Sequence, residues 1–221
     1  MGSRESAFFQ QAARYFELIG PPAPHEAEHA LDILGERPVS NRRLAQIKIL
    51  SASISRNREP VHTAFTNYTF LDVDRCNQCA SLAKITMFRK TKGTWKTESR
   101  FLSGPNPTIT VATFTDLSGD GVRELLVEVG GGVNAWSQTT LYVFDITGPD
   151  LDLLCELPIQ YDSANSGFEW LKYEKKLDFA KTRATGGSHL VFRVATYTKG
   201  RVRLPSPGIT EERVPMKRPT R

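Results

Sequence analysis

Residues 112–130 read ATFTDLSGDGVRELLVEVG and consist of two apolar runs separated by a short polar loop. β-Branched and large apolar residues dominate both runs, which is typical of strands, and the loop between them contains two glycines. The segment therefore predicts two β-strands joined by a tight acidic connection.

The same strand-like character extends outward from this segment, from about residue 61 to residue 204. β-Branched and aromatic residues dominate there, and turn residues recur at short intervals. We therefore expect a mainly β, antiparallel fold. The strand-like runs are 63–73, 81–90, 94–102, 108–115, 123–129, 138–146, 150–158, 168–179, 188–197 and 200–204.

Three hairpins within this region resemble one another and indicate an internal repeat. Their sequences are ITMFRKTKGTWKTESRFL, LYVFDITGPDLDLLCEL and LVFRVATYTKGRVRL, with turn glycines at Gly93, Gly148 and Gly200. Four antiparallel strands in about 50 residues make one blade of a β-propeller. Because closed propellers have about four to eight blades, three units leave an open array, a β-sandwich, or a ring completed by the N-terminal segment.

The chain divides into three regions. Residues 1–58 are expected to be an N-terminal helical segment, although residues 41–55 suit either a helix or a strand. Residues 59–205 form the expected β domain of about three blade-like units. Residues 206–221 contain three prolines and little apolar periodicity, which predicts a basic flexible tail.

The net charge of the 221-residue chain is +5, and most of it lies near the C-terminus. Residues 201–221 hold six basic and two acidic side chains, so they carry +4 of that charge. This stretch lacks the interleaved aromatic residues that stack on bases, so no specific nucleic-acid partner is expected. No apolar run approaches the ~18–20 residues of a transmembrane helix, so no transmembrane segment is expected either.

The acidic loop is the most specific feature of the sequence. Its oxygen-bearing side chains are Asp116, Ser118, Asp120 and Glu124. The main-chain carbonyl of Val122 can add a fifth oxygen, and Gly119 and Gly121 allow the chain to turn tightly. Calcium prefers six to eight oxygen ligands, so these five residues are candidate ligands of one calcium ion. The alternative is a turn in which Asp116 and Asp120 only accept hydrogen bonds from loop amides.

An EF-hand is excluded, because its twelfth position, here Val127, must be a bidentate Glu and helices must flank the loop. The segment instead resembles the calcium loop of integrin-type FG-GAP and VCBS repeats, roughly D-x-[DN]-G-D-G-x-x-[DE]-L before an apolar strand. The matching residues are Asp116, Gly119, Asp120, Gly121, Glu124 and Leu125. The resemblance implies a blade-like fold in which the ion staples two strands together. Ser118 departs from the pattern and implies weaker affinity.

Other motifs carry weaker signals. His25 and His29 belong to an H-E-x-x-H sequence, which binds zinc in some proteases. The neighbouring Pro24 and the charged Glu28 do not suit the long buried helix of such a site. Residues 130–132 are three glycines without the following G-K-[ST] of a phosphate loop. Asn134 and Trp136 follow them and are candidate contacts for a sugar or peptide ligand. The alternative for Trp136 is simple packing.

The three cysteines are too few for a disulfide-rich scaffold. Cys76 and Cys79 fit a local disulfide or a reduced structural pair better than a redox centre or a partial metal site. Cys155 alternates with leucines and is expected in the core.

These observations favour a non-catalytic extracytoplasmic binding or interaction module with one structural calcium ion and a protein or glycan partner. Extracellular calcium is near millimolar, so even a weak loop fills there. No signal peptide is recognisable, so a periplasmic or secreted location implies one that has been removed. The alternative is a secreted hydrolase of a polymer or glycan whose active site is built from loops. An enzyme should show a cleft of converging titratable groups, and a binding module an exposed apolar or aromatic patch.

Overall fold

The computed structural model describes nine stretches of the chain, in which strands predominate. The stretches are 42–53, 60–70, 81–91, 94–102, 107–133, 136–148, 150–163, 171–199 and 202–217. The predicted helices within residues 1–41, the Cys76–Cys79 pair and Asn134 lie outside the described residues. No helix in the described part of the chain is long and apolar enough to cross a membrane.

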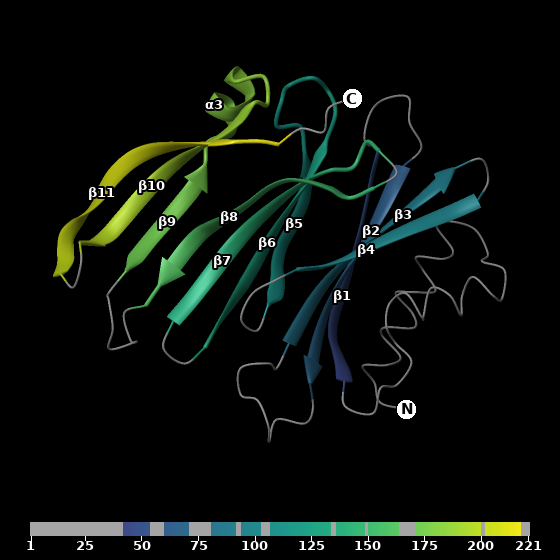
Figure 1. The fold of residues 1–221 in the computed structure, drawn as a ribbon, viewed down its shortest axis with the longest axis horizontal. Coiled ribbons are helices and arrows are strands. Elements are labelled where there is room, and N and C mark those ends of the chain that lie inside the picture. Colours follow the sequence, from purple (N-terminus) through teal and green to yellow (C-terminus); the bar gives the residue numbers. More distant parts are fainter. Residues whose placement is uncertain are drawn as a thin grey trace.

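Two antiparallel sheets account for the architecture (Figure 1). The first sheet has the order β1-β2-β3-β4, so each strand pairs with its neighbour in sequence. Its strands are β1 (Arg42–Ser53), β2 (Pro60–Phe70), β3 (Ser81–Thr91) and β4 (Thr94–Leu102). This sheet is therefore a four-stranded up-and-down meander.

The second sheet is a seven-stranded meander in the order β11-β10-β9-β8-β7-β6-β5. A short helix, α3, lies between β9 and β10 in the sequence. The elements are β5 (Thr108–Thr115), β6 (Glu124–Val133), β7 (Trp136–Asp145), β8 (Asp152–Asp162), β9 (Lys172–Leu177), α3 (Phe179–Ala184), β10 (His189–Lys199) and β11 (Val202–Pro215). The prediction of a mainly β, antiparallel fold is confirmed.

The three predicted hairpins are all present as paired strands. β3 pairs with β4, β7 with β8, and β10 with β11. The strand pairs closest to the turns are Thr91–Thr94, Asp145–Asp152 and Lys199–Val202. Local turn residues and alternating apolar positions were therefore sufficient to predict these pairings.

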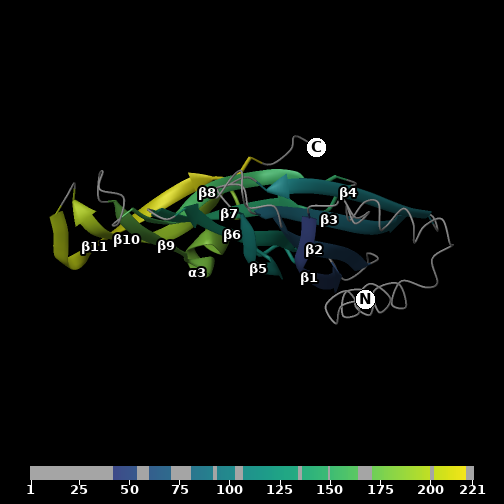
Figure 2. The same cartoon turned by 90° about the horizontal axis from the view of Figure 1, so that it is seen from below.

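The core is divided by the seven-stranded sheet into two apolar clusters. In β6, Leu125 and Val127 belong to one cluster and Leu126 to the other, because successive strand residues point to opposite faces. The first cluster also contains residues of β3 and β4, so it joins the two sheets. The view from below in Figure 2 shows β1–β4 beside the β5 end of the larger sheet. Because both faces of β6 are covered, its sequence is a nearly continuous apolar run.

Residues 42–53 correct the predicted N-terminal helical segment 1–58. They form β1, which pairs antiparallel with β2 along its length, with Ile47 opposite Thr66 and Ile49 opposite Ala64. The apolar residues of this stretch satisfy both a helical and a strand period. The adjacent edge of β2 decides between them, because strand pairing satisfies main-chain hydrogen-bonding groups along both strands.

Residues 206–217 correct the predicted flexible tail 206–221. β11 runs to Pro215 and pairs with β10, and Met216 is buried in the second apolar cluster. The Lys217 amide then donates a 2.9 Å hydrogen bond to the Leu154 carbonyl. The prolines of β11 are compatible with this arrangement, because β11 is the last strand of its sheet and edge strands tolerate proline.

Candidate cation-binding loop

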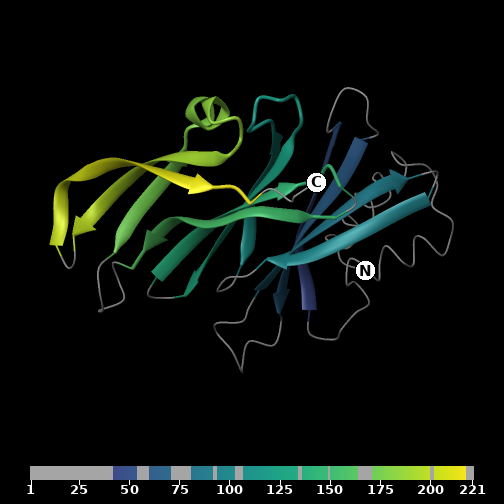
Figure 3. The same ribbon diagram turned by 45° about the horizontal axis from the view of Figure 1, so that its top comes forward.

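The predicted calcium loop connects β5 to β6 at a position fixed by strand pairing. Thr115 and Glu124 are the last pair of the β5–β6 ladder, and the loop between them extends beyond the sheet. Leu117 is fully buried in the second apolar cluster and anchors the loop against the sheet. Figures 1 and 3 both show this loop beside α3.

Asp116 organises the loop through its carboxylate. One oxygen, Oδ1, accepts a 2.6 Å hydrogen bond from the Gly119 amide, and Oδ2 accepts a 2.9 Å bond from the Gly121 amide. Gly119 and Gly121 have φ values of 80° and 81°, which side chains other than glycine rarely adopt. The two glycines therefore bring their amides onto one carboxylate.

Ser118 and Asp120 continue the same pattern within the loop. The Asp120 Oδ1 atom accepts a 2.8 Å hydrogen bond from the Val122 amide. The Ser118 hydroxyl donates to Asp116 Oδ1 and accepts from the Asp120 amide, each at 3.4 Å. These local side chain to main chain bonds are those of Asx and Ser/Thr turns.

Glu124 is nearly fully buried, with 4% of its surface exposed. Its Oε2 atom accepts a 3.0 Å hydrogen bond from the Leu117 amide, which closes the loop across its base. A buried carboxylate requires such partners, because desolvation of an unpaired charge is costly.

Arg183 of α3 contacts the loop from 67 residues away. Its Nε atom donates a 3.0 Å hydrogen bond to the main-chain oxygen of Asp116. Partial burial alone raises the pKa of Asp116. The amide bonds from Gly121 and Gly119, together with the nearby Arg183 guanidinium, outweigh burial and leave that pKa below its usual range.

We expect the Asp116→Asn variant to lower the free energy of unfolding by about 1–2 kcal/mol at pH 7, because hydrogen bonds to an ionised carboxylate are lost. A carboxyl with a lowered folded-state pKa contributes stability above its unfolded pKa and loses it as the pH falls through the folded pKa. The difference from the parent protein should therefore shrink below about pH 4. Urea unfolding at pH 7 and pH 3 measures this change.

The matched control is Ser118→Ala, which removes only two long hydrogen bonds in the same loop. Its effect at pH 7 should be smaller than that of Asp116→Asn. An Asp116→Asn difference that is equal at pH 7 and pH 3 would contradict the role given to the ionised carboxylate.

The structure brings the five predicted ligands into one loop, but their carboxylates are engaged with the loop's own amides. A carboxylate oxygen can accept an amide hydrogen bond and still offer a second lone pair to a hard cation. The donor atoms, all oxygen, match calcium chemistry. Within the described residues, however, no three His, Cys, Asp or Glu side chains are arranged to hold a metal ion.

Trp136, the described member of the predicted ligand pair, belongs to a row of stacked aromatic rings. Its ring centroid lies 5.8 Å from that of Tyr161, and Tyr161 lies 6.2 Å from Tyr173. Trp136 lies on β7, Tyr161 on β8 and Tyr173 on β9, and all three are partly exposed. Lys175 lies 5.5 Å above the Tyr173 ring.

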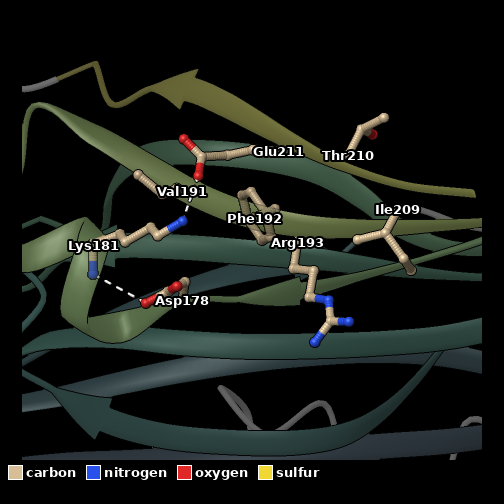
Figure 4. A pocket seen from close by; sticks show the side chains of 8 residues that line it. All are labelled: Asp178, Lys181, Val191, Phe192, Arg193, Ile209, Thr210 and Glu211. Atoms are coloured by element: carbon tan, nitrogen blue, oxygen red, sulfur yellow. Dashed lines mark hydrogen bonds and ion pairs between the residues drawn. The ribbon is translucent and has the colours of Figure 1, made fainter.

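A cavity of about 420 Å³ lies between α3 and the β10–β11 ribbon (Figure 4). Lys181 forms a 2.6 Å ion pair with Glu211, and Glu211 also pairs with Arg213 at 3.1 Å. The hydrogen bond with Glu211 raises the pKa of Lys181, and hydrogen bonds from Lys181 and Arg213 lower the pKa of Glu211. Asp178 caps α3 by accepting from the Lys181 amide at 3.0 Å. These contacts are an ion-pair network and a helix cap.

The sequence did not predict the long-range partners of the acidic loop and of the aromatic row. Arg183 reaches the loop only because α3 folds back beside β10, where the Thr182 hydroxyl accepts from the Val191 amide at 3.0 Å. Tyr161 and Tyr173 join Trp136 because β7, β8 and β9 are adjacent in the sheet, with Tyr161 directly opposite Tyr173. The strand order would have revealed the aromatic row, whereas nothing local to Arg183 indicates its contact.

Comparison with known proteins identifies no relative for this chain. No protein-family model, no curated protein and no solved structure matches it.

Proposed function

We propose that the Asp116–Glu124 loop binds one calcium ion as a structural staple in an extracytoplasmic, non-catalytic binding or interaction module. The observation that supports this most strongly is the loop itself. Five oxygen-donating residues lie within nine positions between two paired strands. The loop is shaped by two glycines with positive φ and anchored by the buried side chains of Leu117 and Glu124. Oxygen donors in a short glycine-containing loop suit calcium.

The proposed ion has a structural role, because it would lie in the connection between two paired strands. Asp116, Ser118, Asp120 and Glu124 supply side-chain oxygens, and Val122 supplies its carbonyl. An ion at these groups would join the end of β5 to the start of β6. It would also screen repulsion among three carboxylates within the loop.

The resemblance to FG-GAP and VCBS loops extends this proposal to the blade-like units. The β1–β4 meander has the strand number and order of one up-and-down blade. The calcium loop connects adjacent antiparallel strands, β5 and β6, as in the blades that it resembles. We infer an open array in which the strands β5–β8 correspond to a second unit within the continuous seven-stranded sheet. The partner of such a module is a protein or a glycan.

The melting temperature with calcium and with chelator tests the ion. Extracellular calcium sites are weak, with a Kd of about 10⁻⁴ M. At a free calcium concentration about ten times that Kd, binding stabilises the folded chain by about 1.4 kcal/mol. For a domain of this size we expect the melting temperature to rise by about 3–6 °C in calcium over EDTA. Asp120→Ala should abolish the rise.

The control for this experiment is Asp162→Asn, which changes a carboxylate that pairs with Lys172 on another part of the sheet. This variant should keep the full calcium response. An equal response in Asp120→Ala and the parent protein would place any calcium effect outside the loop. Fractionation of cells that express the native protein tests the compartment, and recovery in the cytoplasm contradicts it.

A further inference from the structure

Helix α3 is fixed beside the acidic loop by contacts that do not involve the loop itself. The Thr182 side chain is fully buried, and its hydroxyl accepts a 3.0 Å hydrogen bond from the Val191 amide of β10. At the start of the helix, the Asp178 amide donates a 2.8 Å hydrogen bond to the Val191 carbonyl. The sheet therefore determines where α3 lies.

Arg183 of α3 meets the loop at two points. Its Nε atom donates to the Asp116 carbonyl at 3.0 Å, and a Cβ atom added at Gly119 would lie 4.0 Å from the Arg183 Cβ atom. The loop is anchored to the same part of the fold, because Leu117 shares the second apolar cluster with Leu190 of β10. The loop and the Arg183 side chain are thus held against each other.

The charges of the loop do not balance on their own. Its carboxylates are those of Asp116, Asp120 and Glu124. Its one guanidinium is that of the exposed Arg123, so three negative charges and one positive charge leave a net charge of −2. Arg183 adds a second positive charge from another element. A cation beside carboxylates favours their ionised forms and repels any further cation.

We propose that Arg183 is a built-in counter-charge of the acidic loop and sets the affinity of this loop for calcium. This inference rests on the function proposed above. In the ion-free protein the guanidinium partly neutralises the three carboxylates. With calcium bound, the same guanidinium lies near a divalent cation, and their repulsion weakens binding. Arg183 thereby restricts occupancy of the loop to near-millimolar calcium, the range of extracellular modules. By linkage, bound calcium weakens the contact between Arg183 and the loop to the same degree.

Two variants of Arg183 separate its charge from its hydrogen bond. In Arg183→Gln the amide nitrogen occupies the position of the arginine Nε atom, since both follow three side-chain carbons, so the donor to Asp116 remains and the charge is lost. Arg183→Lys keeps the charge. By calorimetric titration, the Kd for calcium should be about three- to fivefold lower in Arg183→Gln than in the parent protein. Arg183→Lys should bind as the parent protein does. The difference should shrink in 1 M NaCl, which screens the repulsion.

Melting of the calcium-free protein tests the counter-charge without any ion. At pH 7 the melting temperature of Arg183→Gln should be about 1–3 °C lower than that of the parent protein, because an attraction at an exposed site is lost. This loss should shrink at pH 3, where carboxylates are largely protonated, and should be absent in Arg183→Lys.

The outcomes distinguish this proposal from the proposed function. If the parent protein binds calcium and Arg183→Gln binds with an equal or higher Kd, the role of Arg183 is overturned and the calcium loop stands. If neither protein binds calcium, the proposed function and the affinity-setting role fail together. The calcium-free melts then decide the counter-charge separately, and equal melting temperatures of Arg183→Gln and the parent protein at pH 7 would contradict it.

Discussion

Replacing Phe144 with alanine should lower the free energy of unfolding by about 3–5 kcal/mol, the largest single effect expected in this protein. Phe144 is fully buried in the apolar cluster that joins the two sheets. Its ring stacks on Tyr142 with a centroid distance of 6.3 Å. The alanine variant loses these contacts and leaves a cavity that β-sheet neighbours fill poorly. Chemical denaturation measures the change.

Phe179 provides the matched control for this substitution. It lies at the start of α3 with 45% of its surface exposed, so Phe179→Ala should change the free energy of unfolding by less than about 0.5 kcal/mol. An equally small loss of free energy of unfolding in Phe144→Ala and Phe179→Ala would contradict a core shared between the two sheets.

The second large effect is expected at Leu117, the apolar anchor of the acidic loop. Leu117→Ala should cost about 2–5 kcal/mol, because a fully buried leucine is removed from the second cluster. Unlike Phe144→Ala, this substitution should also disturb the acidic loop. The Leu117 amide donates to Glu124, and the Leu117 side chain anchors the loop against the sheet. Calcium affinity should therefore fall in Leu117→Ala although no proposed ligand is replaced.

Leu171→Ala is the control for Leu117, because the Leu171 side chain is 44% exposed. This variant should retain both its stability and its calcium response. A Leu117→Ala protein that binds calcium as tightly as the parent protein would show that the loop does not depend on its anchor.

The features that the sequence predicted correctly depend on local patterns. The hairpins around Gly93, Gly148 and Gly200 were recognised because a turn residue separates two strand-like runs. Cys155 was expected in the core from its alternation with leucines, and it is buried in the second cluster. The acidic loop was delimited correctly, because its flanking runs are strands on both sides.

The errors concern segments whose structure is decided by distant partners. The residues of β1 fit a helical period as well as a strand period, and only the pairing with β2 selects the strand. The prolines of β11 suggested an unstructured tail, whereas their position on the sheet edge permits pairing with β10. The contact of Arg183 with Asp116 depends on how α3 packs, which no local pattern specifies.

The corrected C-terminus places part of the charged stretch 201–221 in the folded sheet. Residues 202–215 are part of the folded sheet, so their basic residues lie on a defined surface. Arg213 pairs with Glu211, and Glu212 pairs with Lys175 at 2.8 Å. Residues 202–215 hold two basic and two acidic side chains, so this part of the sheet contributes no net charge.

The stoichiometry of calcium binding, measured by isothermal titration calorimetry on chelator-treated protein, tests whether the Asp116–Glu124 loop holds an ion. We predict one calcium ion per chain with a Kd of about 10⁻⁴–10⁻³ M, as expected of extracellular modules. Binding should be lost in Asp120→Ala and preserved in Asp162→Asn. Absence of binding at millimolar calcium in a folded parent protein, or equal binding in Asp120→Ala, would contradict calcium binding by this loop.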